Sequence, residues 1–198
     1  MKKFLKVLLL VLVLAFLYFG FTTYPKLDLI SGFSAKSVAS GHFIDNRPLD
    51  LIQKTDNDIN LVDLAKNSID DAGKFAISSV YGLKERKAIY REGLGATLIN
   101  DDFDITKPYL LPKRTKLENS LPFPYGNNEP KDSTFANIDY SKLKKAVDNA
   151  FDKTGGRIKR TRAVVVLYKD YLIAEKYDTG FNKDSKILGW SMTKSITS

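Results

Sequence analysis

The sequence predicts a mixed α+β fold that follows an N-terminal transmembrane helix. Three features predict this class: an apolar stretch over residues 4–21, an amphipathic helix over 139–151, and two β-like runs at 162–168 and 171–177. The chain has 198 residues, of which 43% are hydrophobic and 27% charged. This length and composition suit a packed core, so disorder throughout the chain is not expected.

Residues 4–21 read FLKVLLLVLVLAFLYFGF, with one charge at Lys6. A helix of this length is about 27 Å long, at the short end of what a bilayer requires. Lys2, Lys3 and Lys6 all lie at its N-terminal end, so the positive-inside rule places the rest of the chain outside the cytoplasm.

Two fates of this segment are open, a retained anchor and a cleaved signal peptide. Cleavage requires small residues near the site. The residues after Ala15 are bulky, namely Phe-Leu-Tyr-Phe-Gly-Phe, which favours a retained anchor.

The chain divides into three parts by composition: a signal anchor at 1–21, an N-terminal extension with a Pro-rich connector at 22–138, and the start of a main domain at 139–198. Within the extension we expect a linker at 22–29 around Pro25 and a short helix at 31–42. Strands are expected at 74–81, 87–90 and 96–99. Five prolines between residues 104 and 138 remove backbone donors and indicate a surface connector.

The main domain begins with a helix over 139–151. Leu143, Val147, Ala150 and Phe151 recur on one face of a 3.6-residue period, and Asp139 is a suitable N-cap. Gly155 and Gly156 end the helix. The runs 162–168 and 171–177 then predict a hairpin that turns at residues 169–170.

Ser191-Met192-Thr193-Lys194 is an S-x-x-K motif, a spacing that suits nucleophilic catalysis. A serine hydroxyl needs a base, and residues three apart on a helix share one side, so the Lys194 amine can reach Ser191. Such a lysine must be neutral, and burial or a cationic neighbour has to supply most of that change. The Ser191 backbone N–H is a candidate oxyanion donor.

The tetrapeptide alone is weak evidence of a catalytic serine, because roughly one or two matches are expected by chance in a chain of this kind. Ser141 and Lys144 form a second match in the first turn of the amphipathic helix. There we expect both side chains to be solvated, without a catalytic role.

Context distinguishes Ser191. The order helix, hairpin, polar loop and Gly-Trp-Ser-Met-Thr-Lys-Ser, with VVVLYKD at 164–170 and LGWSMTKS at 188–195, resembles the β-lactamase/penicillin-binding-protein family. The resemblance is to its class-C-like branch, which includes esterases, D-aminopeptidases and hydrolases of 6-aminohexanoate oligomers. It is detailed over residues 139–198, and residues 35–43 and 93–98 are similar to the N-terminal extension of large exported members.

The resemblance implies a β-lactamase/transpeptidase-like fold in which Ser191 forms an acyl-enzyme and Lys194 acts as base or proton relay. The family also uses a Tyr-x-Asn motif and a Lys/His-x-Gly motif well downstream of the serine. Neither lies within these residues, and the nucleophile helix has only begun at Ser198. We therefore expect the chain to be an incomplete N-terminal part that is inactive alone, although a true short product is the other possibility.

Two function classes follow. The first is a membrane-anchored serine hydrolase of the bacterial cell envelope, acting outside the cytoplasmic membrane on amide or ester bonds. The second is a non-catalytic remnant or an envelope binding protein on the same scaffold. The partners expected are a small-molecule or peptide substrate and the membrane, with no nucleic acid, cofactor or metal. The substrate (β-lactam, peptide, ester or oligoamide) and the oligomeric state stay open.

Other candidate residues have simpler explanations. The chain has no cysteine and one histidine, His42, so thiolate chemistry and multi-histidine metal sites are excluded, and His42 is expected to be structural. Trp190 is expected to pack in the core or the pocket wall. The aspartates at 56, 58, 63, 70 and 71 lack calcium-loop spacing. A basic cluster could bind anionic lipid or cell-wall polymer, although a solvated turn is the simpler explanation; its members are Lys153, Arg157, Lys159, Arg160 and Arg162.

Overall fold

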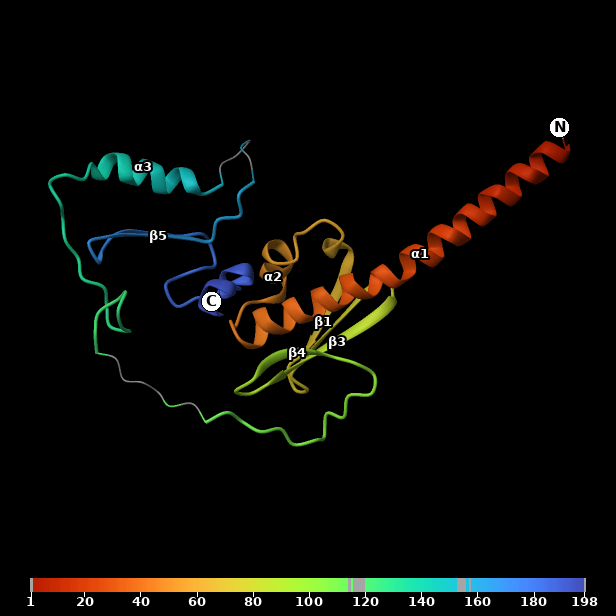
Figure 1. Cartoon of the computed structure of the whole chain (residues 1–198), viewed down its shortest axis with the longest axis horizontal. Helices are drawn as coiled ribbons and strands as arrows, with labels where there is room; N and C mark the ends of the chain where they lie inside the picture. The colour runs from red at the N-terminus through yellow and green to blue at the C-terminus, as the bar shows by residue number, and fades with distance from the viewer. Residues whose placement is uncertain (1, 114, 116–119, 153–155, 157, 198) are drawn as a thin grey trace. The chain divides into compact units, whose positions relative to one another are not determined.

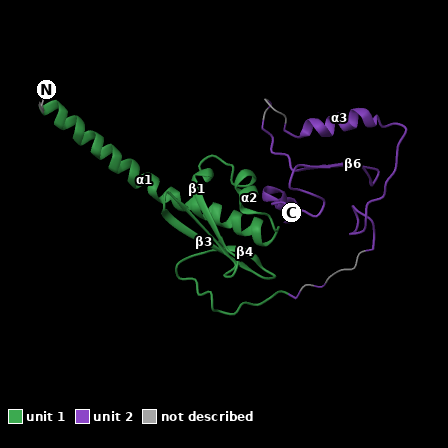
Figure 2. Cartoon of the chain, turned by 180° about the vertical axis from the view of Figure 1, so that it is seen from behind, with its two compact units in different colours: residues 1–112 green, residues 113–198 purple. Residues whose placement is uncertain are grey.

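The computed structural model describes residues 2–113, 115, 120–152, 156 and 158–197. The chain is a mixed helix and sheet protein with one long apolar N-terminal helix. It forms two compact units, residues 1–112 and residues 113–198 (Figure 2).

Unit 1 is organised around a single long helix, α1 (Lys2–Phe43). Its N-terminal half is exposed and apolar, and it is long and apolar enough to cross a membrane (Figure 1). Its C-terminal half is buried, with Ala35, Val38 and Ala39 fully inaccessible. One continuous helix therefore has an exposed apolar part at its N-terminal end and contributes to the core of unit 1 at its C-terminal end.

The C-terminal half of α1 packs on a four-stranded antiparallel sheet. The strands β1 (Ala65–Asp70), β2 (Phe75–Val80), β3 (Leu83–Arg91) and β4 (Gly95–Ile99) follow the order β1-β2-β3-β4, a simple meander. A short helix, α2 (Leu49–Thr55), and a 3-10 turn, η1 (Val62–Leu64), connect α1 to the sheet.

Small side chains allow the helix to approach the sheet closely. The core combines Ala35, Val38 and Ala39 of α1 with Ile52 of α2 and alanines on the three later strands. A Cβ on Gly41 would lie 2.9 Å from the Ile52 side chain of α2, so a larger residue at position 41 would displace Ile52. Four serines of α1, at positions 31, 34, 37 and 40, are also buried.

The described residues of unit 2 form a helix, a hairpin and a short helical segment after the hairpin. The helix α3 (Tyr140–Ala150) is followed by β5 (Ala163–Tyr168) and β6 (Tyr171–Tyr177), which pair in antiparallel fashion. Val147 and Phe151 are buried on the α3 side. The chain ends in a 3-10 turn, η2 (Trp190–Thr193), and a short helix, α4 (Lys194–Thr197).

The predicted helix at 139–151 and the predicted hairpin are confirmed, and Asp139 caps α3 by accepting a 3.0 Å hydrogen bond from the Lys142 N–H. The prediction that Gly155 and Gly156 end this helix is wrong, because α3 already ends at Ala150; Gly155 itself lies outside the described residues. The predicted strands at 74–81, 87–90 and 96–99 correspond to β2, β3 and β4.

The predicted linker at 22–29 is wrong, because α1 continues through it. Pro25 removes one helical donor, yet packing of residues 31–43 on the sheet stabilises the helix beyond it. The unit boundary at 112/113 also differs from the sequence division at 138/139. Part of the connector lies along the hairpin, where Leu172 N donates to Lys131 O at 3.3 Å.

Candidate active site

The S-x-x-K motif lies where a polar loop turns into the last helical segment of unit 2. After β6, the Asp178 N–H donates to Arg162 O at 2.9 Å, which closes the base of the hairpin. The loop then leads to Gly189, whose carbonyl accepts a 2.9 Å hydrogen bond from Met192 N–H and begins η2. Ser191 is therefore in the first helical turn after the hairpin.

The backbone places Ser191 and Lys194 at equivalent positions of successive turns. Lys194 N–H donates to the carbonyls of Ser191 and Met192. In a 3-10 turn, side chains three residues apart eclipse, so the two residues share one side of the segment. Thr193 Oγ1 closes the turn by donating to Trp190 O at 2.7 Å.

Trp190, immediately before Ser191, has a φ of 45°. A bulky non-glycine residue rarely adopts this left-handed region. The same left-handed region occurs at turns elsewhere in the chain, as at Tyr81 and Lys169. At Trp190 it belongs to the turn that begins η2, directly before the candidate nucleophile.

Both motif side chains are exposed in this structure. Among the side-chain hydrogen bonds of the described residues around the motif, none joins Ser191 Oγ to Lys194 Nζ. The described residues thus supply the spacing of a serine–lysine pair, while the desolvation that would make the amine a base is not supplied by them.

The second S-x-x-K match behaves differently. Ser141 is exposed on α3, and Lys144 Nζ donates to Asp148 Oδ2 at 2.6 Å. The same carboxylate accepts from Lys176 Nζ at 2.6 Å. Hydrogen bonds from Lys144 and then Lys176 lower the pKa of Asp148 to about 2. Lys144 thus pairs with a surface carboxylate, and this contact does not suit it to act as a catalytic base.

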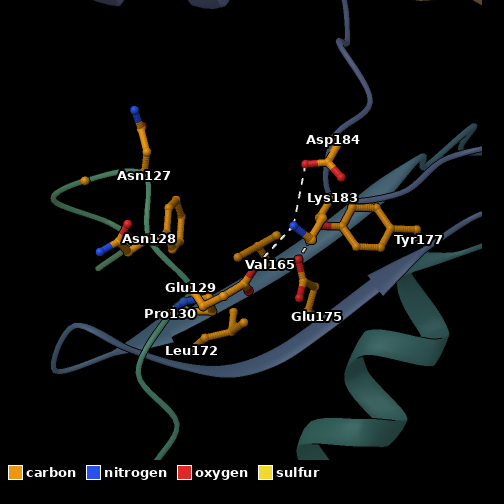
Figure 3. Close-up of a pocket in the computed structure, with 12 residues that line it drawn as sticks. Asn127, Asn128, Glu129, Pro130, Val165, Leu172, Glu175, Tyr177, Lys183 and Asp184 are labelled. Carbon is orange, nitrogen blue, oxygen red and sulfur yellow. Dashed lines mark hydrogen bonds and ion pairs between the residues drawn. The ribbon is translucent and has the colours of Figure 1, made fainter. Parts of the chain in front are cut away.

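A cavity of about 350 Å³ lies in unit 2 between the connector and the hairpin (Figure 3). Pro130, Val165 and Leu172 form its apolar floor. Lys183 stands at its rim, 3.3 Å from Glu129 and 3.6 Å from Asp184. The Glu129 hydrogen bond is the main cause that raises the pKa of Lys183. Neither Ser191 nor Lys194 lines this cavity.

Tyr177 also lines this cavity. Its hydroxyl donates to the Glu175 carboxylate. Burial, followed by this hydrogen bond and the negative charge of Glu175, raises the pKa of Tyr177 to about 12. Tyr177 therefore serves as a hydrogen-bond donor at neutral pH and does not ionise there.

Trp190 corrects one prediction, because 63% of its surface is exposed and it does not pack in a core. His42 is structural as expected: its Nε2 lies 2.7 Å from Asp71 Oδ1 and its Nδ1 lies 3.1 Å from Arg47 O. Among the described residues, no group of three or more acidic or histidine side chains lies together as a metal site.

The basic cluster is partly described, since Lys153 and Arg157 lie outside the described residues. Lys159 Nζ contacts Asn149 O, at the C-terminal end of α3. Cations are favourable there because the helix dipole is negative at that end. The Asp152 carboxylate accepts hydrogen bonds from the backbone of Lys159 and Arg160, which lower its pKa. This part of the cluster has a structural use.

Sequence reasoning missed a serine–lysine contact outside the two S-x-x-K motifs. Lys36 Nζ donates to Ser40 Oγ at 2.9 Å, one turn along α1, and burial lowers the pKa of Lys36. The only signal was an i, i+4 spacing, which is common on helices. Ser40 is buried against the sheet, so a substrate has no access to its hydroxyl.

Comparison with protein-family models, with curated proteins and with solved structures gives no match for this chain.

Proposed function

We propose that the protein is a membrane-anchored serine hydrolase that cleaves amide or ester bonds through an acyl-enzyme on Ser191. Ser191 Oγ attacks the substrate carbonyl, and its proton passes to Lys194 Nζ and then to the leaving group. Water hydrolyses the resulting ester and restores the serine hydroxyl. The resemblance to β-lactamase-related hydrolases suggests this chemistry.

One observation carries the proposal. Ser191 and Lys194 occur at S-x-x-K spacing in the first helical turn after a hairpin. Ser191 immediately follows Trp190, whose backbone is in the left-handed region. The competing match at Ser141 has its lysine engaged by Asp148. Of the two motifs, the one at Ser191 has the local structure that suits a nucleophile.

The proposed location is the bacterial cell envelope, with both units outside the cytoplasmic membrane. The apolar half of α1 and its lysines at the N-terminal end support this orientation. The absence of an acidic residue before Asp28 also favours insertion of this segment.

The experiment compares two matched pairs of variants in membranes of cells that express the gene with its whole natural coding sequence, rather than these 198 residues alone. Hydrolysis of a chromogenic ester, an amide and a cephalosporin is measured for Ser191→Ala and Lys194→Ala, with Ser141→Ala and Lys144→Ala as controls. We expect the first pair to lose about a thousandfold or more in kcat/KM. We expect the control pair to keep activity. Equal activity of all four variants would refute the proposal.

A binding role is the second candidate function, and the cavity of Figure 3 favours it. Its apolar floor and charged rim have the composition of a small-ligand site, and Ser191 is outside it. This candidate predicts ligand-dependent stabilisation that Lys183→Ala removes and Ser191→Ala preserves. The two sets of variants therefore separate the candidates.

A further inference from the structure

The turn between β2 and β3 exposes apolar side chains at one end of the unit 1 sheet. Tyr81 is 72% exposed and Leu83 is 46% exposed. Tyr81, Gly82 and Lys84 all have positive φ, so the turn is tight and projects its side chains outward. Two exposed apolar side chains are ordinary on a protein surface, so their position relative to α1 decides whether they have a role.

This turn is fixed beside the part of α1 where the apolar segment ends. Lys84 Nζ lies 4.6 Å from the centroid of the Tyr24 ring. Arg86 Nη1 donates to Asp28 Oδ2 at 2.7 Å, one turn further along the helix. The sheet end that carries the turn therefore adjoins the exposed half of α1 (Figure 1).

The other end of the sheet lies at the C-terminal end of α1. There the Phe43 ring stacks on Tyr90 with 5.8 Å between centroids, and His42 reaches Asp71. The strand β2, whose six residues span about 20 Å, separates the two ends. The sheet thus has an end near the apolar segment and an end away from it.

The depth of the turn follows from helix geometry, and this step rests on the membrane anchoring proposed above. Residues 4–23 of α1 span about 30 Å, the thickness of a bilayer's hydrocarbon core. Tyr24 then lies at the outer interface, where tyrosine is enriched. Since Lys84 contacts the Tyr24 ring, the β2–β3 turn lies at the same depth.

We propose that the β2–β3 turn, residues 80–84, is a second membrane contact that docks on the phospholipid interface beside α1. Tyr81 and Leu83 enter the boundary between headgroups and acyl chains, and the Lys84 ammonium extends to the phosphates. Glu85 is exposed next to the turn, so the contact is with the headgroup layer rather than the hydrocarbon interior. The consequence is a fixed orientation of unit 1 on the membrane.

The chain has no cysteine, which allows single labels at chosen depths. Three variants of the full chain, Leu83→Cys, Ala72→Cys and Leu12→Cys, carry an environment-sensitive fluorophore in phosphatidylethanolamine–phosphatidylglycerol vesicles with brominated acyl chains. Leu83 probes the proposed contact. Ala72 is the matched control, because it lies in the exposed turn at the opposite end of the same sheet. Leu12 reports anchoring itself.

We expect the labels at positions 83 and 12 to show blue-shifted emission and quenching by bromine, and the label at 72 to match a fully aqueous probe. Adding Tyr81→Asp to the Leu83→Cys variant should reduce the quenching at position 83. A quenched label at 12 with an aqueous label at 83 would overturn the docking and leave the anchor intact. An aqueous label at 12 would overturn the anchoring on which both proposals rest.

Discussion

Arg86 donates a 2.7 Å hydrogen bond to the carboxylate of Asp28, so a central strand is tied to the helix α1 across 58 residues of sequence. Both side chains are partly shielded, with exposed fractions of 20% and 36%. Arg86 also donates to Asn100 Oδ1 at 3.3 Å. This pair joins the end of the sheet that carries the β2–β3 turn to the helix.

Replacing Arg86 by alanine is expected to lower the free energy of unfolding of unit 1 by about 1–2 kcal/mol, because a charged hydrogen bond in a half-shielded site is lost. Urea-dependent proteolysis of the detergent-solubilised protein measures this. The control is Lys54→Ala, which removes an exposed pair with Asp50 at 3.8 Å. If both variants unfold at the same urea concentration, the Arg86 contact contributes nothing.

Replacing Arg47 is expected to lower stability more than replacing Arg86. The Arg47 side chain is 6% exposed and pairs with two buried carboxylates, Asp45 and Asp56. Arg47→Met would remove the guanidinium that pairs with both buried carboxylates. We expect it to cost about 3–5 kcal/mol of unfolding free energy. The triple variant that also carries Asp45→Asn and Asp56→Asn should recover part of that loss in the same proteolysis assay; no recovery would show that the charges are not the cause.

The paired lysines of Asp148 predict an acid-dependent change in unit 2. The folded pKa of Asp148, about 2, lies below the usual value near 4 for an unfolded chain. Stability from this group is therefore complete above about pH 4 and is lost as the pH falls toward 2. The Asp148→Asn variant should have a flatter stability profile over this window. Circular dichroism in urea at several pH values measures it, with the exposed Asp184→Asn as control.

Tyr177 predicts a loss of stability at alkaline pH. Its folded pKa of about 12 exceeds the usual tyrosine value near 10, so its contribution is complete below about pH 10 and is lost as the pH rises toward 12. Tyr177→Phe should remove that alkaline loss, since phenylalanine keeps the ring without an ionisable hydroxyl. Measuring the urea midpoint of unfolding as the pH is raised tests this. The same alkaline loss of stability in the variant would contradict it.

Local sequence signals predicted the elements of unit 2 well. The helix α3 has both a capping aspartate and an apolar face, and the hairpin has a two-residue turn between β-rich runs. These signals act over short distances, so the sequence alone is sufficient. The strands β2, β3 and β4 were predicted for the same reason.

Long-range packing explains what the sequence did not predict. The helix α1 continues through Pro25 because residues after it are buried on a sheet that forms later in the chain. The strand β1 was missed because its sequence, AKNSID, is polar. Its Asn67 accepts hydrogen bonds from Ser34 and Ser78, a partly buried network that only the folded structure assembles.

The candidate site shows the same division. The motif spacing identified Ser191 and Lys194, and backbone hydrogen bonding places them on successive turns. The exposure of Trp190 was not predicted, because whether an aromatic side chain is buried depends on which distant residues pack against it. The cavity of Figure 3 was missed because it joins residues near 129 to residues near 183.

The central claim is that Ser191 is a nucleophile, and covalent trapping tests it most directly. Membranes of cells expressing the gene are treated with a fluorophosphonate probe and digested with trypsin. Cleavage after Lys186 and Lys194 places Ser191 in the peptide 187–194, whereas Ser141 falls in the peptide 132–142. We predict a probe-mass addition on 187–194 that is lost in Lys194→Arg, a variant that keeps the tryptic site. A modified 132–142 peptide, or no modification of 187–194 under conditions that label other serine hydrolases, would contradict the account.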